Sequence, residues 1–249
     1  MTRKKIYILV GIILVGVLLF GVYWFYFANP KAFLSDDKVV QELNELNDGA
    51  SVETALDTMF VDEEHVVVPF VNQNNQYGLS YWVWRHHRWK PIKVDESGEP
   101  MIWRINQTDP STYHIVWNIH PDDKLGSTKF YLLRERNYQI TYGEHHYTPQ
   151  IQMEKSVSIQ NNPYGVMQLP NEWATIMSEI GEVNEAKQSP AFFHDMFPDP
   201  SLYIGWIPYD QNGDEKFPEH SVNGSSYHYG DINVDFVRIL NEVDLERVQ

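Results

Sequence analysis

Residues 150–159, QIQMEKSVSI, alternate between apolar and polar side chains. The two sets of alternate positions are Ile151, Met153, Val157 and Ile159, and Gln152, Glu154, Ser156 and Ser158. Because successive side chains of a β-strand point to opposite faces of its sheet, this alternation predicts a strand with one buried face. The stretch therefore indicates a protein built at least partly from half-buried sheets.

The chain before this segment has the composition of several more strands. β-Branched and aromatic residues are concentrated in short segments that polar turns separate. The predicted strands are His65–Val71, Gly78–Lys90, Met101–Asn106, Thr112–His120, Thr128–Arg136 and Tyr138–Tyr142, with further strands at Leu202–Tyr209 and within Tyr227–Leu240. Consecutive strands joined by short turns predict a mainly antiparallel β-meander.

Helices are predicted on both sides of these strands. Ser35, Asp36 and Asp37 are suited to the start of a helix, and apolar residues then recur at helical spacing. The other predicted helices are Ser51–Phe60, Asn171–Lys187 and a short one within Asn241–Gln249. Runs of strands flanked by helices, without β-α-β alternation, predict an α+β fold. We favour one domain over residues 31–249. The alternative is a subdomain boundary near residue 160, where the chain becomes acidic and proline-rich.

The N-terminal residues 6–28, IYILVGIILVGVLLFGVYWFYFA, contain no charged side chain. As a helix they would extend roughly 34 Å, enough to cross a hydrocarbon core of about 30 Å. Arg3, Lys4 and Lys5 precede the run and an aromatic cluster ends it. Basic residues stay on the cytoplasmic side, so the sequence predicts a single-pass transmembrane helix at 6–28, a cytoplasmic segment at 1–5 and an extracytoplasmic domain at 31–249.

A cleaved signal peptide is the alternative interpretation of this segment. Signal peptides have a shorter apolar core, usually about 7–15 residues, that ends in a site of small residues. Cleavage after Ala28 would place the bulky Tyr26 where a small side chain is needed. We therefore expect a retained signal-anchor that places the protein in the cell membrane. Through residues 6–28 its partner would be the lipid bilayer.

The charge of the chain limits its partners. It has 19 basic and 34 acidic residues, a formal net charge of −15, and three of the basic residues precede the apolar run. The remaining domain is therefore strongly acidic and is not expected to bind nucleic acid, anionic lipids or anionic wall polymers. Cations, neutral glycans and basic protein surfaces stay compatible with it.

The chain contains no cysteine. This excludes disulfides, a thiol nucleophile and any cysteine-ligated metal site. Extracytoplasmic domains without disulfides are more typical of bacteria, and in particular Gram-positive bacteria, than of small secreted animal proteins.

Aromatic and basic residues are interleaved in the most distinctive local feature of the sequence. Its members are Trp82, Trp84, Arg85, Arg88, Trp89, Trp103 and Arg104. On one uninterrupted strand, Trp82, Trp84 and Arg88 would share a face and Trp89 would lie on the other. Exposed, Trp82, Trp84, Arg88 and Trp89 would form a ligand-binding face, whereas buried they would form a large core.

The acidic C-terminal third contains candidate metal ligands. His194, Asp195, His220, His228 and Asp231 lie on chain broken by proline and glycine, and histidine with carboxylate suits zinc or a similar ion. They lack the spacing of any established zinc motif, so hydrogen-bonded or solvated histidines are the alternative. Residues 210–215, DQNGDE, resemble the start of a calcium loop, but position six is Glu215 and position twelve is Ser221, which favours a plain polar turn.

The sequence predicts no catalytic residue and no cofactor. Its glycines form no phosphate-binding loop, and no serine lies in a nucleophile-elbow motif. The leading hypothesis is therefore a binding or interaction module at the outer membrane face, whose partner would be another membrane or cell-wall protein. The alternative is an extracytoplasmic hydrolase or metal-dependent enzyme that uses the His/Asp-rich C-terminal third.

Overall fold

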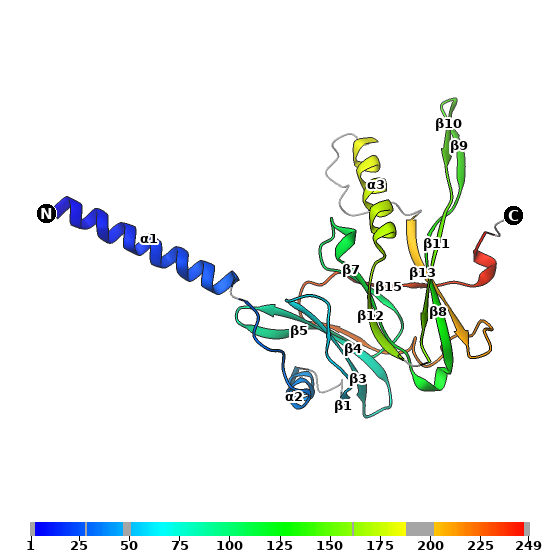
Figure 1. Cartoon of the computed structure of the whole chain (residues 1–249), viewed down its shortest axis with the longest axis horizontal. Coiled ribbons are helices and arrows are strands. Elements are labelled where there is room, and N and C mark those ends of the chain that lie inside the picture. The colour runs from blue at the N-terminus through cyan, green and yellow to red at the C-terminus, as the bar shows by residue number, and fades with distance from the viewer. Residues whose placement is uncertain (1–2, 28, 47–50, 161, 188–201, 247–249) are drawn as a thin grey trace.

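The computed structural model describes residues 3–27, 29–46, 51–160, 162–187 and 202–246. Within these residues the fold is mixed, with mostly antiparallel sheets and a small number of helices (Figure 1). The helices are α1 (Arg3–Phe27), α2 (Asp36–Leu46) and α3 (Asn171–Lys187), with short 3-10 turns η1 (Pro110–Thr112), η2 (Pro121–Asp123) and η4 (Glu242–Asp244). The predicted α+β class with antiparallel strands is confirmed.

The first sheet lies closest to α1 in the chain and in space (Figure 1). Its order is β1-β3-β4-β5-β14, and β2 also pairs with β3. The strands are β1 (Val52–Ala55), β2 (Met59–Phe60), β3 (His65–Asn72), β4 (Tyr77–Arg85), β5 (Arg88–Asp95) and β14 (Ser226–His228). All of these pairs are antiparallel.

Two further sheets and a ribbon follow. The second sheet has the order β12-β7-β6-β15 and the third β11-β8-β13-β16, while β9 and β10 pair with each other. The strands are β6 (Met101–Arg104), β7 (Tyr113–Asn118), β12 (Tyr164–Gln168), β15 (Val234–Phe236), β8 (Leu125–Arg134), β11 (Ile151–Ser158), β13 (Leu202–Asp210), β16 (Arg238–Ile239), β9 (Asn137–Thr141) and β10 (Glu144–Thr148). The short β13–β16 pair is parallel and the others are antiparallel.

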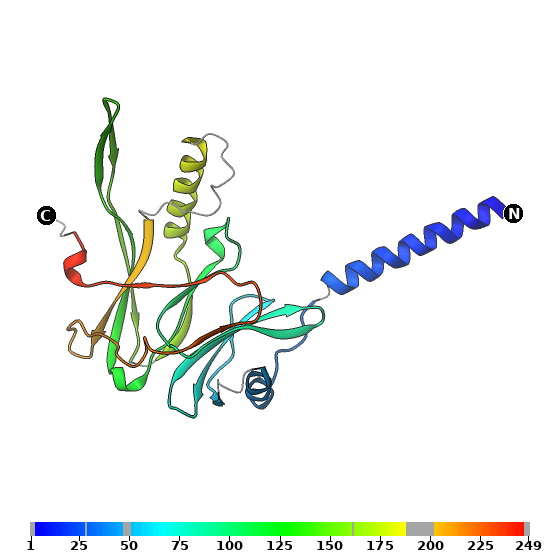
Figure 2. The same ribbon diagram turned by 180° about the vertical axis from the view of Figure 1, so that it is seen from behind.

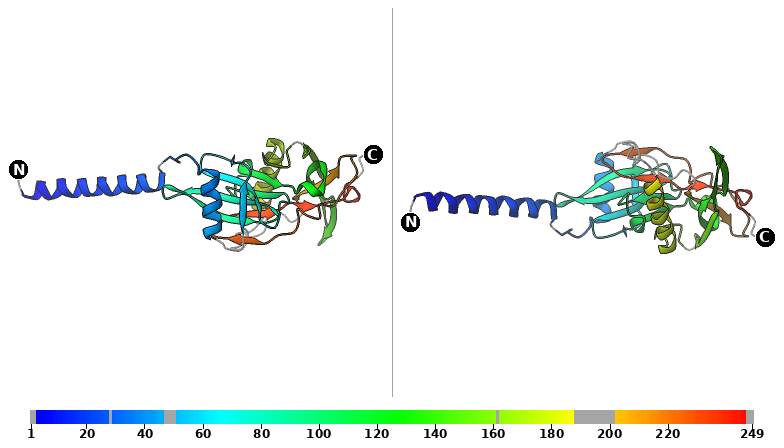
Figure 3. Two further views of the ribbon diagram at one scale, coloured as in Figure 1. Left: turned by 90° about the horizontal axis from the view of Figure 1, so that it is seen from below. Right: turned by 90° about the horizontal axis from the view of Figure 1, so that it is seen from above.

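Clusters of buried hydrophobic side chains lie between these elements, whose arrangement Figures 2 and 3 show from further directions. Alternation along β3 separates two of these clusters: Val66 and Val68 pack in the cluster that includes α2, and Val67 packs in the cluster shared with the second sheet. Alternation along β7 does the same, because Val116 belongs to the cluster shared with the first sheet and Trp117 to the cluster shared with the third sheet and α3. The second sheet is therefore covered on both faces, which explains why every residue of β7 is buried.

The segment after α3 joins all three sheets. Its successive strands add to the third sheet (β13), the first (β14), the second (β15) and the third again (β16). Strands from both sides of residue 160 therefore share each sheet. A division of the chain at that point would remove strands from all three.

The predicted helix at residues 51–60 is wrong. β1 pairs with β3 instead, and the side-chain amide of Asn44 accepts a hydrogen bond from Val52 N (2.7 Å) and donates one to Val52 O (2.9 Å). These partners satisfy the backbone in extended form, so tertiary pairing outweighs a local pattern that is compatible with a helix. The predicted helices that begin near Asp36 and at Asn171 are present.

The predicted single strand Gly78–Lys90 is also wrong, because the chain reverses at His86 and His87. Both histidines have positive φ angles, 54° and 61°, as the central residues of a tight hairpin turn require. This turn lacks the glycine or asparagine that usually marks it, so its position could not be predicted from composition. The reversal pairs Trp84 with Trp89 across the two strands, so these side chains share a face.

Replacing His87 with glycine is expected to stabilise the fold. A non-glycine residue in the left-handed region costs about 1 kcal/mol, and glycine removes that cost. We expect the His87→Gly variant to gain about 0.5–1 kcal/mol in the free energy of unfolding, measured by urea titration. A loss of stability would instead mean that the stacking of His87 on Trp24, with ring centroids 5.7 Å apart, contributes more than the backbone strain costs.

Helix α1 extends away from the sheets, and a short linker joins it to the domain (Figures 1 and 3). The linker is fixed to the first sheet, because Trp89 Nε1 donates a hydrogen bond to Lys31 O (3.0 Å) and Phe33 packs edge-on against Trp82 and Trp89. Among the residues described, no helix has both the length and the apolar character that a membrane span requires.

Candidate functional site

A cavity of about 370 Å³ lies at the rim between the first and second sheets. Its walls come from β3, β4 and β5 on one side and from β6 on the other. The chain between β14 and β15 completes it, because those strands belong to different sheets and their connection must cross from one to the other. The lining residues are His65, Val83, Arg85, Ile92, Trp103, Arg104, Ile105, Gln107, Asp231, Ile232 and Asn233.

His65 is the titratable ring in this cavity, and a carboxylate holds it in place. Its Nδ1 lies 2.8 and 2.9 Å from the two oxygens of Asp62, and its ring packs edge-on against Trp103 at 5.2 Å. Partial burial acts to raise the pKa of Asp62, but hydrogen bonds from His65 and from Glu64 N outweigh it, so this pKa lies below its usual value. An ionised carboxylate only accepts hydrogen bonds, so Nδ1 carries the proton and Nε2 is left as an acceptor when the ring is neutral.

The two arginines of the cavity differ in their environment. Arg104 Nη1 donates to Asn233 Oδ1 (3.1 Å) and pairs with Asp235, and its guanidinium lies 5.8 Å from the centre of the Tyr113 ring. Arg85 is exposed, and no ion pair is formed with it by any residue that the structure describes. Arg104 therefore stabilises the wall, whereas the charge of Arg85 is available to a ligand.

The lining combines apolar side chains with polar groups that can hydrogen-bond to a ligand. Apolar side chains from both sheets form much of the wall, and Arg85, Gln107 and Asn233 supply hydrogen-bond donors. A guanidinium recognises carboxylate and phosphate groups through paired hydrogen bonds. The lining contains no serine, threonine, cysteine or lysine that could act as a nucleophile.

The tryptophans of the predicted binding face are buried. Trp82, Trp84 and Trp89 are 0%, 7% and 6% exposed and pack in one cluster with α2. The interpretation as core therefore describes their environment, and the hairpin register corrects the prediction that Trp89 lies on the opposite face. Arg88 is exposed beside the turn. Of the interleaved aromatic and basic residues, Arg85, Trp103 and Arg104 are the ones that line the cavity.

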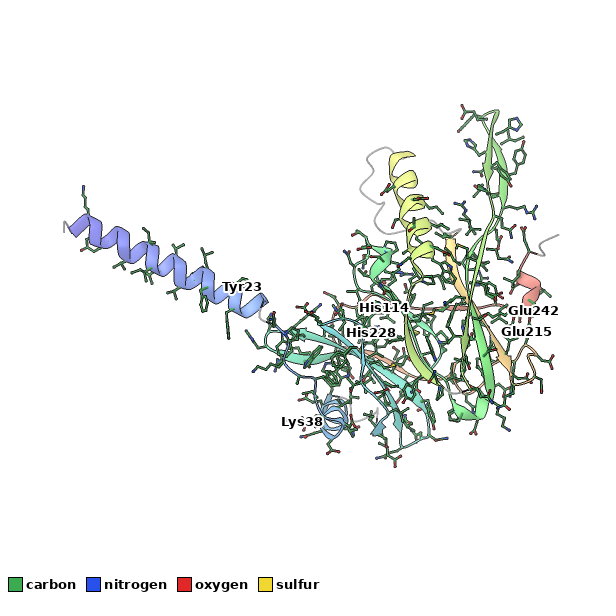
Figure 4. All side chains as sticks on the ribbon, in the orientation of Figure 1. Tyr23, Lys38, His114, Glu215, His228 and Glu242 are labelled. Carbon is green, nitrogen blue, oxygen red and sulfur yellow. The ribbon has the colours of Figure 1, made fainter. Side chains whose placement is uncertain are left out.

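The described members of the predicted metal site are not gathered together. His220 stacks near His120 with ring centroids 5.0 Å apart, His228 is exposed on β14 (Figure 4), and Asp231 lines the cavity. In the parts of the chain that the structure describes, no group of three or more histidine, aspartate or glutamate side chains is placed to hold a metal ion. His194 and Asp195 lie outside the described residues.

Residues 210–215 form a compact polar turn after β13. Asp210 Oδ1 accepts hydrogen bonds from Asn212 N (2.7 Å) and Asp214 N (3.1 Å), and Gly213 supplies the positive φ angle of 89°. These backbone hydrogen bonds, that from Asp214 foremost, hold the pKa of Asp210 below its usual value. Asp210 thus stabilises its own turn. A polar turn of this kind is what the sequence favoured over a calcium loop.

A second cluster of polar groups is buried beneath the segment that leads to β14. Lys93 Nζ lies 2.7 Å from Asp95 Oδ2 and 2.9 Å from Ser226 Oγ, and Ser97 Oγ donates to Asp95 Oδ1 (2.7 Å). Ser225 N donates to Glu96 Oε2 (3.2 Å). This polar cluster attaches residues 225–226 to the end of β5, and its charges are compensated by hydrogen bonds rather than exposed to a ligand.

Glu99 lies at the edge of this cluster, and its raised pKa predicts that the stability of the fold depends on pH. Burial, with a smaller contribution from Asp95, raises its pKa from 4.5 to about 7. The folded state therefore holds this proton more tightly than the unfolded state, so its contribution is fully present below pH 4.5 and is lost as the pH rises through 7. We expect the Glu99→Gln variant to melt at a higher temperature than the parent at pH 8 and at a similar temperature at pH 5.

The matched control is Glu219→Gln, because Glu219 is an exposed carboxylate on the nearby loop. Melting temperatures of the parent and both variants are compared from pH 4 to 8. Parallel curves for the parent and Glu99→Gln would contradict the assignment to Glu99.

The sequence did not predict that the cavity residues lie close together in space. His65, Arg85, Arg104 and Asn233 come from four separate segments, and none of their spacings resembles a motif. One local signal for the site was available in the sequence. Asp62 lies three residues before His65, and at this spacing its carboxylate can reach the histidine ring.

Comparisons of the chain with protein-family models, with curated proteins and with solved structures each found no match.

Proposed function

We propose that this protein is a membrane-anchored binding domain at the outer membrane face, and that its cavity receives an anionic group of a partner or small ligand. The observation that carries the proposal is Arg85, an exposed guanidinium without an ion-pair partner among the described residues, in a cavity whose lining combines apolar side chains with polar ones and the carboxylate of Asp231. Carboxylate and phosphate are the groups that such a guanidinium binds best. Trp103 and Ile92 would contact the apolar part of the ligand.

The apolar N-terminal segment supports the anchoring part of the proposal. Residues 6–28 carry no charge and follow Arg3, Lys4 and Lys5. Trp24 of α1 stacks on His87, but other large side chains described in this helix are exposed, for example Leu14 (64%), Leu18 (66%) and Phe20 (65%). A helix that is apolar on all sides is expected in a protein interior or in lipid. The absence of charge and this exposure support the membrane as the environment of the segment.

Anchoring is tested on the full chain in membranes. We expect it to remain in the pellet after extraction at high pH, and we expect protease added to intact cells to degrade the domain. Release at high pH would contradict insertion, and protection of the domain in intact cells would contradict the orientation.

Substitution of Arg85 is expected to remove ligand binding. The full chain in detergent is screened by thermal shift against carboxylates and phosphate esters that carry an apolar group, and hits are measured by calorimetry. We expect Arg85→Ala to weaken binding at least tenfold, since a hydrogen bond to a charged group contributes about 1.5–3 kcal/mol.

Arg88→Ala is the matched control, because Arg88 pairs with Arg85 across the same hairpin and is also exposed, but does not line the cavity. We expect Arg88→Ala to bind like the parent. Equal loss in both variants would indicate general attraction by positive charge and would contradict a specific site.

A further inference from the structure

β9 and β10 form a two-stranded ribbon that projects beyond the third sheet (Figures 1 and 2). It continues the β8–β11 hairpin outward and pairs with no other described strand. Tyr142 and Gly143, at its turn, have positive φ angles of 53° and 84°. A two-stranded ribbon buries little surface and is marginally stable by itself in water.

The register gives this ribbon one apolar face. Tyr138 is paired with Tyr147 and Ile140 with His145, and residues two apart on a strand share a face. A hydrogen bond between the hydroxyl of Tyr138 and Nδ1 of His145 confirms that these two side chains lie on the same side. Gln139 and His146, which also pair, lie on the opposite face. The ribbon is therefore amphipathic.

The apolar face is open to solvent. Tyr138, Ile140 and Tyr147 are 57%, 58% and 67% exposed. An aromatic side chain carries about 150–250 Å² of surface, so these three side chains and the fully exposed Tyr142 of the adjoining turn together expose on the order of 500 Å². Two such faces in contact would bury about 1,000 Å², the lower limit for a specific protein interface.

We propose that the apolar ribbon face pairs with the same face of a second copy of this chain. A two-fold axis makes such contacts self-complementary, so the tyrosine pair of one copy would stack on that of the other. The charge distribution favours this surface for self-association, because the chain carries a formal charge of −15 and the apolar face contains no carboxylate. Two copies that meet there place no carboxylate of this face against another.

The direction of the ribbon is compatible with pairing in one membrane. It projects across the long axis that α1 and the domain share, rather than along it (Figure 1). With α1 along the membrane normal, the ribbon would extend sideways at a fixed height above the bilayer. This geometric argument rests on the proposed anchoring, whereas the pairing of the apolar faces does not.

The absence of cysteine in the chain allows a direct test. Single-cysteine variants of the full chain, in membranes, are treated with a bifunctional maleimide with a flexible spacer. We expect Ile140→Cys and Tyr147→Cys to give a covalent dimer, and we expect the controls Gln139→Cys and His146→Cys, on the opposite face of the same strands, to give none.

A second measurement tests the strength of the pairing. The full chain in detergent is expected to have the mass of a dimer by light scattering, and the double variant Ile140→Ser, Tyr147→Ser that of a monomer with an unchanged melting temperature. A monomeric parent, equal crosslinking from both faces, or crosslinks only to a different protein would each overturn the proposal. Extraction of the parent at high pH, measured separately, tests the anchoring alone.

Discussion

Asp123→Ala is expected to lower the free energy of unfolding by about 3 kcal/mol or more. The carboxylate of Asp123 is buried and accepts hydrogen bonds from His220 N (2.9 Å), Ser221 N (3.0 Å) and Ser221 Oγ. Its removal leaves buried donors without an acceptor, and each costs about 1–3 kcal/mol. The measurement is urea denaturation of the full chain in detergent.

The neighbouring Asp122 provides the control for this prediction, because its side chain is 67% exposed. We expect Asp122→Ala to change stability by no more than about 0.5 kcal/mol. Hydrogen exchange should also show faster exchange at residues 220–228 in the Asp123 variant, since Ser221 O accepts from both Gly98 N and Glu99 N and joins this segment to the end of β5. Equal stability of the two variants would contradict a structural role for Asp123.

Trp82→Ala is expected to cost about 3–5 kcal/mol, as is usual for removing a large aromatic side chain from a core. Trp82 is fully buried, its Nε1 donates to Ser80 Oγ (2.9 Å), and Phe33 of the linker packs edge-on against it at 5.5 Å. Loss of the indole would therefore leave a cavity between the first sheet and the linker. Thermal and urea denaturation measure the loss.

This variant also tests whether Trp82 acts as part of the core or as part of a ligand-binding face. A stable Trp82→Ala protein that has lost ligand binding would support a surface role and contradict the core assignment. Trp82→Phe is the conservative comparison, and it is expected to lose less stability because most of the apolar volume is retained.

Periodicity identified the elements whose buried face is set within a single segment. The alternation of residues 150–159 predicted β11, and the helix predicted at Asn171–Lys187 is present as α3. In both cases local sequence and final packing agree, which is the condition under which such patterns predict well.

Elements that depend on distant partners were not predicted. The histidine turn after β4 has no composition signal, and β12 was missed because five residues beside Pro163 become a strand only by pairing with β7. The burial of the Asp95 and Asp123 carboxylates was not predicted, because sequence alone does not show which acidic residues acquire hydrogen-bond donors. The cavity was missed for the same reason, since its lining comes from five separate segments of the sequence.

The distribution of β14, β15 and β16 over three sheets has a consequence for synthesis. The first and second sheets each keep an unpaired edge strand, β5 and β6, until residues 226–236 have left the ribosome. Unpaired strand edges are sites of aggregation during folding. Chains whose synthesis stops before residue 226 would therefore be prone to aggregate, even though most strands of these sheets have already been made. Cells that make this protein would benefit from keeping the growing chain apart from its neighbours until that point.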